Sequence, residues 1–154
     1  AALEFIYKKR FNEYILDKFH NNKKIIGICL GMQLLFDQSE EGLMKGLNIF
    51  NLNSKILKSG KNRVPNIGWR NIQNDDVING RDKLNSMQFY FMHSYSISFE
   101  KFKSKYPRAI AYYSNCNSKF LACFRLDNIT GFQFHPEKSY HYGDRALSFA
   151  LSDY

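Results

Sequence analysis

Long apolar runs and paired cysteines are what this sequence of 154 residues most plainly lacks. No stretch approaches the roughly 20 apolar residues of a membrane-spanning helix, and no charged segment leads into an apolar run with a small-residue cleavage site. With three cysteines and no Cys-x-x-Cys spacing, neither a zinc site nor a redox motif is indicated. We therefore expect a cytoplasmic protein without a membrane partner.

The composition favours a globular chain with an unusual charge. Hydrophobic residues make up 44% and aromatic residues 16% of the sequence, which is typical of a protein with a packed core. The formal net charge is +8, yet the basic residues occur in scattered short groups and are not interleaved with stacking aromatics. We attribute the excess to compositional bias and expect no nucleic-acid partner.

The order of elements predicts an α/β domain. An apolar stripe with a spacing of four residues predicts an amphipathic helix over 2–19. The β-branched run 24–28 reads as a buried parallel strand, and 32–36 as the helix that follows it. After Gly46 we expect short strands and one closing helix, at 54–58, 66–73, 88–93, 95–99, 109–113, 120–126, 129–134 and 143–151. Because no strand precedes the first helix, we expect the natural N-terminus to lie upstream.

The segment Gly27-Ile28-Cys29-Leu30-Gly31 has the pattern of a nucleophile on a tight strand-to-helix turn. Such a turn strains the nucleophile's backbone and requires neighbours without side chains. The following helix would favour the thiolate, and the Leu30 N–H would hold an oxyanion. The alternative is that Cys29 is a small buried apolar residue, as single cysteines commonly are.

A base and its orienting group are found near the end of the chain. His135 and Glu137 stand two apart after an apolar strand, so an extended backbone would direct both side chains the same way. Pro136 restrains the preceding histidine to an extended conformation. Alone, this segment also fits a surface turn; together with the cysteine turn it indicates a Cys-His-Glu triad.

Four motifs resemble those of class I glutamine amidotransferases. Two are general signatures of that family, and two narrow the similarity to the glutaminase subunits of imidazole glycerol phosphate synthase. They are GICLGMQLLF at 27–36, VPNIGW at 64–69, FYFMHSY at 89–95 and GFQFHPEKS at 131–139. The resemblance runs from about residue 3 to 152.

This resemblance implies a flavodoxin-like, three-layer α/β domain over residues 1–154, with a mainly parallel central sheet that lacks its first strands. It implies Cys29, His135 and Glu137 as the catalytic triad. It further implies roles for other residues: Leu30 and Gly31 at the oxyanion; Gln33, Glu41, Ser94 and Tyr95 on the substrate glutamine; and Trp69, Arg70, Tyr90 and Lys138 at a partner interface.

The implied partner is a (β/α)8-barrel cyclase subunit that receives ammonia within a heterodimer. Because that partner would handle the phosphorylated substrate, we expect no metal and no cofactor in this chain. Outside the resemblance, Gln33 and Glu41 also fit an exposed helix face and loop, and the aromatic residues fit a core.

Three departures from the family pattern leave alternatives open. Asn66 stands where histidine is expected, Arg70 where asparagine is expected, and Ser96 where tyrosine is usual. The first two bear on the partner, so a paralogue serving surface-sugar biosynthesis is the main alternative. A regulatory subunit without catalysis and a stand-alone cysteine hydrolase are the others.

Overall fold

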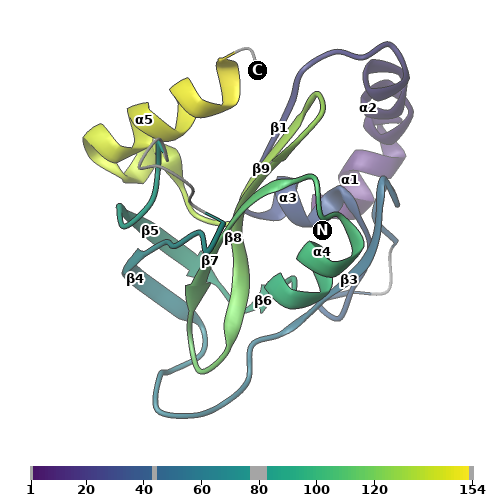
Figure 1. Cartoon of the computed structure of the whole chain (residues 1–154). Coiled ribbons are helices and arrows are strands. Elements are labelled where there is room, and N and C mark those ends of the chain that lie inside the picture. Colours follow the sequence, from purple (N-terminus) through teal and green to yellow (C-terminus); the bar gives the residue numbers. More distant parts are fainter. Residues whose placement is uncertain (1, 43–44, 77–82, 153–154) are drawn as a thin grey trace.

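The computed structural model describes residues 2–42, 45–76 and 83–152. Helices and strands alternate along much of the chain (Figure 1). The helices are α1 (Ala2–Lys8), α2 (Phe11–His20), α3 (Leu30–Leu34), α4 (Phe99–Lys105), α5 (Tyr140–Leu151) and the 3-10 helix η1 (Pro136–Lys138). The strands are β1 (Ile25–Ile28), β2 (Phe36–Ser39), β3 (Phe50–Ile56), β4 (Asn66–Asn71), β5 (Gln88–His93), β6 (Tyr95–Ser96), β7 (Ile110–Asn115), β8 (Lys119–Leu126) and β9 (Ile129–Phe132).

The central sheet has the strand order β1-β9-β8-β7. β1 and β9 are parallel, whereas β8 is antiparallel to both β9 and β7. The described sheet is thus mixed, and our expectation of a mainly parallel sheet was wrong in this respect. The cause is local: β7, β8 and β9 are joined by turns of two or three residues, which can only connect antiparallel strands.

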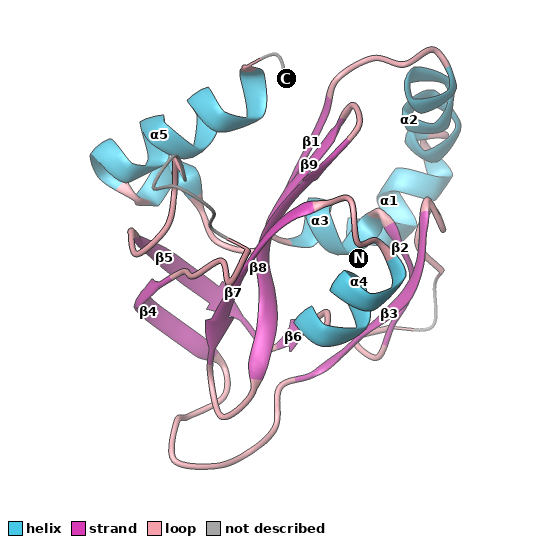
Figure 2. Ribbon diagram, viewed as in Figure 1, coloured by secondary structure: helices cyan, strands magenta, loops and turns pink. Residues whose placement is uncertain are grey.

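Apolar side chains form a core on each face of this sheet, which gives the three layers that we expected. One core packs Phe132 and Phe134 against Phe149 of α5. The other packs Met32 of α3 and Phe102 of α4 against Phe124 of β8. Figure 2 shows α5 on one side of the twisted strands and α1 to α4 on the other. The α/β class is therefore confirmed.

Two predicted helices differ from the structure. The expected helix 2–19 is divided into α1 and α2 at Arg10, which has a left-handed backbone with φ of 58°. The expected helix 32–36 begins earlier, at Leu30, and ends at Leu34, so that Phe36 starts β2. Both elements lie where the sequence predicted helix, but periodicity alone did not locate the breaks.

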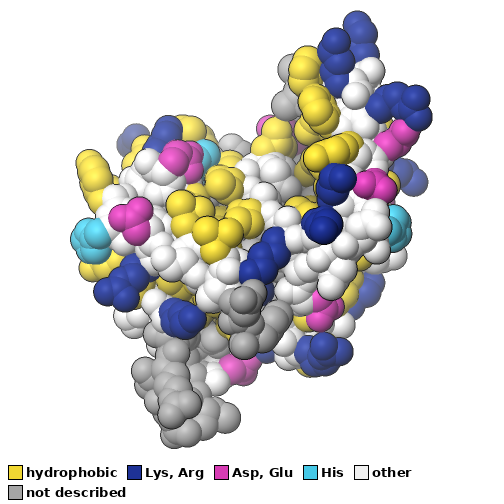
Figure 3. Space-filling view, turned by 90° about the horizontal axis from the view of Figure 1, so that it is seen from above, with side chains coloured by type: hydrophobic (Ala, Val, Ile, Leu, Met, Phe, Trp, Pro, Cys, Tyr) yellow, Lys and Arg dark blue, Asp and Glu magenta, His cyan; other side chains and the backbone are white. Residues whose placement is uncertain are grey.

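The outer surface carries dispersed charge. On the face shown in Figure 3, Lys and Arg side chains are dispersed over the edges and the middle, and hydrophobic atoms are exposed between them. Within the described residues, none of the helices has the length and apolar character needed to cross a bilayer.

β4 and β5 form a separate antiparallel pair beside the central sheet. Their register sets Ile67 opposite Met92 and Trp69 opposite Tyr90. Because side chains alternate along a strand, these four lie on one face, and three of them are more than 40% exposed. The opposite face, which carries Phe89, Phe91 and His93, is buried.

Candidate active site

Cys29 lies at the turn between β1 and α3, as the sequence predicted. Its backbone has φ of 50° and ψ of −106°, a conformation that costs free energy for a residue with a side chain. The Cys29 N–H donates to the carbonyl of Phe132 at 2.7 Å, which extends the β1–β9 pairing by one residue. The neighbouring strand therefore holds the strained turn in place.

The two glycines of the turn are not equivalent. A Cβ on Gly27 would lie 2.7 Å from the Gly31 carbonyl oxygen and 2.8 Å from backbone atoms of Met32. A Cβ on Gly31 would meet nothing within 4 Å. The expectation that close neighbours of Cys29 must lack side chains is therefore confirmed at Gly27 and wrong at Gly31, because only Gly27 faces the backbone of α3.

His135 and Glu137 lie just beyond the end of β9. The His135 Nδ1 atom and the Glu137 Oε1 atom are 2.6 Å apart. His135 itself is extended, with φ of −103° and ψ of 97°, but Pro136 begins a 3-10 helix. The predicted contact is present, although a helical turn makes it where we expected an extended strand.

The environment of the thiol opposes its ionisation. Burial is the main cause that raises the pKa of Cys29, and the negative charges of Glu41 and Glu137 add to it. The N–H of Leu30 and the amide of Gln133 act in the opposite direction. The helix start thus favours the thiolate as predicted, but desolvation outweighs this effect in the free protein.

No hydrogen bond joins the Cys29 sulfur to His135 among the described residues. The thiol instead donates to the carbonyl of Met92 at 3.7 Å, and the Gln133 Nε2 atom lies 3.8 Å from the sulfur. The His135 Nε2 atom is buried and has no partner. The hydrogen-bonding capacity of that nitrogen is therefore unused in the described structure.

A pocket of about 280 Å³ opens at Cys29. Its lining contains all four residues that the resemblance assigned to the substrate and the first of the two assigned to the oxyanion: Gln33, Glu41, Ser94, Tyr95 and Leu30. Gly31, His135 and Glu137 are not among its lining residues. The predicted substrate residues, which lie as much as 62 positions apart in the sequence, thus converge on the cysteine.

Gln33 is buried and held by two acceptors. Its Nε2 atom donates to the Tyr95 carbonyl at 2.9 Å and to the Gln133 Oε1 atom at 3.1 Å. Its Oε1 atom is buried without a partner. The sequence analysis gave Gln133 no role although it lies in a quoted motif. The available signal was that Gln133 is a lone amide between Phe132 and Phe134 in an apolar segment.

Ser139 is a second residue to which the sequence analysis assigned no role. It is fully buried, its hydroxyl donates to the His135 carbonyl at 2.7 Å and it accepts from the Tyr90 N–H at 3.0 Å. The His135 N–H also donates to the Tyr90 carbonyl at 2.9 Å. The turn that carries the histidine is therefore fastened to β5.

The residues predicted at a partner interface lie on two sides of β4. Trp69 packs edge-on against Tyr90, and the Lys138 Nζ atom lies 6.0 Å from the Tyr90 ring centre. Tyr140, which is 79% exposed, stacks on Trp69. Arg70 lies on the other face of the strand, where it contacts Asn66 and the Cys116 sulfur. Strand alternation thus separates Arg70 from Trp69, and a place for Arg70 at the partner interface stays a prediction.

Asn66, one of the departures from the family pattern, belongs to a buried polar network. Its amide nitrogen lies 2.9 Å from His93 Nε2, and its amide oxygen accepts from Arg70. His93 Nδ1 contacts the Tyr95 carbonyl at 2.9 Å, so both ring nitrogens of this histidine have partners. Burial lowers the pKa of His93 to about 4, so the ring is neutral at physiological pH.

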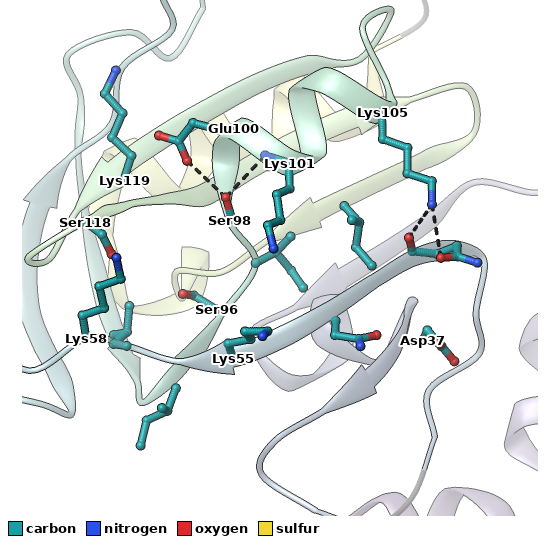
Figure 4. Close-up of a pocket in the computed structure, with 16 residues that line it drawn as sticks. Asp37, Lys55, Lys58, Ser96, Ser98, Glu100, Lys101, Lys105, Ser118 and Lys119 are labelled. Carbon is teal, nitrogen blue, oxygen red and sulfur yellow. Dashed lines mark hydrogen bonds between the residues drawn. The ribbon is translucent and has the colours of Figure 1, made fainter.

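A larger hollow lies away from this site. It measures about 890 Å³ and lies between β3 and α4 (Figure 4). Five lysines line it, but Lys105 is bound to Asn51 and Lys119 to Asp75. None of the predicted site residues lines it. Across the described ranges, no group of three or more His, Cys, Asp or Glu side chains is arranged to hold a metal ion.

This fold and this cysteine turn define a class of protein. The family described as glutamine amidotransferase class-I matches residues 7–151. A crystal structure of a glutamine amidotransferase from Thermotoga maritima shares the fold, with a TM-score of 0.56 at 15% identity, covering 95% of this chain and 54% of that one. The chain belongs to the class I glutamine amidotransferase family.

Within that family, its curated relatives carry a more specific name. Proteins of Methanococcus maripaludis and Oceanobacillus iheyensis, called imidazole glycerol phosphate synthase subunit HisH 2 and HisH, are 37% and 36% identical to it. The matches cover 82% and 95% of this chain, and 64% and 71% of those relatives. The chloroplastic imidazole glycerol phosphate synthase hisHF of Arabidopsis thaliana is 34% identical over 90% of this chain and 23% of its own length. The chain thus spans about two thirds of the length of the HisH proteins that it resembles.

Proposed function

We propose that this chain is the glutaminase part of imidazole glycerol phosphate synthase. It hydrolyses the side-chain amide of glutamine, through a thioester on Cys29, and passes ammonia to a cyclase partner in the cytoplasmic synthesis of histidine. The observation that supports this most is the convergence of the predicted substrate residues on Cys29 in one pocket. The names of the HisH relatives favour the cyclase of imidazole glycerol phosphate synthase, over other enzymes, as the partner that uses the ammonia.

The pocket offers the groups that a zwitterionic amino acid needs. Glu41 supplies a carboxylate for the α-ammonium group. The Gln33 Oε1 atom adds an acceptor, because both N–H groups of that amide are already used. The backbone at Ser94 and Tyr95 borders the same space, where it would position the α-carboxylate. The side-chain amide then points toward Cys29.

The chemistry follows from the triad. The Cys29 thiolate attacks the amide carbon and forms a carbon–sulfur bond, while the Leu30 and Gly31 N–H groups hold the oxyanion. His135, oriented by Glu137 through the 2.6 Å contact, gives a proton to the nitrogen, and ammonia leaves. His135 then takes a proton from water, which attacks the thioester and releases glutamate and the thiolate.

The exposed aromatic face of β4 and β5 is the surface that we assign to the partner. Trp69, Ile67 and Met92 are 43%, 56% and 41% exposed, and the latter two also line the Cys29 pocket. Apolar surface next to a pocket mouth is typical of a protein–protein contact. Lys138 beside Tyr90 adds a cation for an ion pair with a barrel-shaped cyclase subunit in a heterodimer.

The test joins adduct formation to ammonia transfer. The full-length protein is assembled with its cyclase partner and treated with a glutamine-like electrophile. We expect one adduct, mapped to Cys29 by peptide mass spectrometry, and loss of glutamine-dependent formation of imidazole glycerol phosphate while ammonia-dependent formation persists. No adduct on Cys29 would favour a regulatory subunit instead. Glutamine turnover that ignores every added partner would favour a stand-alone hydrolase.

Two departures from the family pattern favour a second candidate for the acceptor of the ammonia. Asn66 and Arg70 replace the residues expected beside the partner segment, and they bind one another. A paralogue that supplies ammonia in surface-sugar biosynthesis would carry the same triad and a different partner surface. Assembly with the histidine cyclase but not with a sugar-pathway cyclase supports the main proposal, and the reverse result supports the paralogue.

A further inference from the structure

Gln133 connects the candidate nucleophile to the candidate substrate pocket. It is fully buried and follows Phe132 at the end of β9. Its Nε2 atom lies 3.8 Å from the Cys29 sulfur, and its Oε1 atom accepts from Gln33 Nε2 at 3.1 Å. The two ends of one amide thus contact two residues with different predicted tasks.

The orientation of this amide follows from its neighbours. The Tyr95 carbonyl can only accept, so the Gln33 group that contacts it at 2.9 Å must be the N–H₂ group. The second hydrogen of that group then faces Gln133, which must present its oxygen there. Only the Gln133 N–H₂ group remains to face the sulfur. The Tyr95 carbonyl therefore orients the Gln33 amide, and Gln33 in turn orients Gln133 so that its N–H₂ group faces the Cys29 sulfur.

We propose that Gln133 is a positioning residue with two effects: its N–H₂ group stabilises the Cys29 thiolate, and its carbonyl oxygen holds Gln33 in the orientation that receives glutamine. This assignment rests on the proposed glutaminase function for its second effect only. It is separate from the triad, because Gln133 exchanges no proton and does not contact His135 or Glu137 through any described hydrogen bond.

The thiol's other contacts make this donor important. Burial and two nearby carboxylates disfavour a negative charge on the sulfur. The Met92 carbonyl at 3.7 Å accepts from the S–H group and so favours the protonated form. Besides the Leu30 N–H group, the Gln133 amide is the group that favours the thiolate. A hydrogen bond to a charged group is stronger than one between neutral groups, so its contribution grows as the proton leaves.

Two variants separate the two effects. Gln133→Met has a similar shape and loses both the donor and the acceptor. Gln133→Glu keeps an oxygen that accepts from Gln33 but presents no N–H to the sulfur and adds a negative charge. Thr130→Val is the matched control, since Thr130 is a buried polar residue of β9, 3% exposed, and its register partners are Ile26 and Arg125.

The first measurement is the rate of Cys29 alkylation by iodoacetamide against pH, with adducts mapped by mass spectrometry because the chain also contains Cys116 and Cys123. This readout needs no glutamine. We expect the inflexion to rise by about one pKa unit in Gln133→Met and by more in Gln133→Glu, where a like charge is added. Thr130→Val should match the wild type.

The second measurement is glutamine turnover by the assembled enzyme. We expect kcat to fall about tenfold in Gln133→Met and by more in Gln133→Glu, in line with their smaller thiolate fractions. KM should rise several-fold in Gln133→Met and stay within about twofold in Gln133→Glu, which still holds Gln33.

An unchanged alkylation profile and unchanged kcat in Gln133→Met would overturn the proposal, and so would equal shifts in Thr130→Val. If the Gln133 variants show shifted alkylation profiles but the assembled wild-type enzyme never turns over glutamine, the effect on the thiol is supported and the glutaminase function is refuted.

Discussion

Replacing the two glycines of the cysteine turn one at a time tests whether the turn works as described. In Gly27→Ala the new methyl group would lie 2.7 Å from the Gly31 oxygen and 2.8 Å from the Met32 backbone. Ordinary contact begins at 3.4 Å, so the start of α3 must move away from β1 by about 0.7 Å. Backbone atoms cannot rotate out of the way as a side chain can. We expect the free energy of unfolding to fall by about 1–3 kcal/mol, the usual cost of overpacking.

The same displacement reaches the chemistry, because α3 carries the Leu30 N–H and follows Cys29 directly. A shift of about 1 Å in a reacting group can cost about 100-fold in rate, so we expect kcat for glutamine to fall between tenfold and 100-fold. Gly31→Ala is the matched control. Its methyl group meets nothing within 4 Å, and alanine favours a helix over glycine, so stability should be unchanged or higher by up to about 1 kcal/mol.

The assays are urea denaturation of each variant and glutamine turnover with the partner present. A Gly27→Ala protein as stable and as active as the wild type would contradict the close contact between Gly27 and α3. An equally damaging Gly31→Ala would contradict it as well, since the turn would then depend on glycine flexibility and not on the contact between β1 and α3.

Three further predictions follow from the same structure. The neutral, buried His93 has a pKa of about 4 against an ordinary 6.5, so the unfolded chain binds a proton at higher pH than the folded chain does. The free energy of unfolding should therefore fall by up to about 3 kcal/mol as pH drops from 6.5 to 4. In His93→Gln, urea denaturation should show a smaller loss over that range, and an equal loss in both proteins would contradict the assignment. Trp69→Ala should weaken binding of the cyclase partner by about 1–3 kcal/mol, as for an aromatic anchor, while Leu147→Ala, on exposed α5 surface, should not; calorimetric titration decides between them. Cys29→Ala should abolish glutamine hydrolysis and leave ammonia-dependent synthesis intact, and residual hydrolysis in the assembled protein would exclude Cys29 as nucleophile.

Most helices and strands of the fold could be predicted from local signals in the sequence. The strand 129–134 was predicted and β9 spans Ile129–Phe132; the strand 88–93 matches β5. These segments are apolar, β-branched or aromatic and bounded by turn residues, so local preference and tertiary packing agree. The direction of pairing did not follow from such signals, because it depends on which strands are joined by short turns.

The candidate site was predicted through motifs, and its details were not. Cys29 and Gln33 from the first motif line one pocket with Ser94 and Tyr95 from the third, whereas Gln133 was overlooked although it is a lone amide in an apolar segment. The effect of burial on the Cys29 thiol was not predicted either. The start of the helix indicated a thiolate, whereas desolvation raises the pKa of the thiol. Strand alternation could have been used to predict that Arg70 and Trp69 lie on opposite faces of β4.

The pairing of β1 with β9 also has a consequence for synthesis on the ribosome. Within the described chain β1 has a single strand neighbour, β9. Ile28 can pair only after its register partner Phe132 has been synthesised, about a hundred residues later. At roughly 5–20 residues per second, the cysteine spends several seconds in a nascent chain without its turn, its histidine or its pocket. The turn at Cys29 and its pocket are therefore assembled only after β9 has been synthesised.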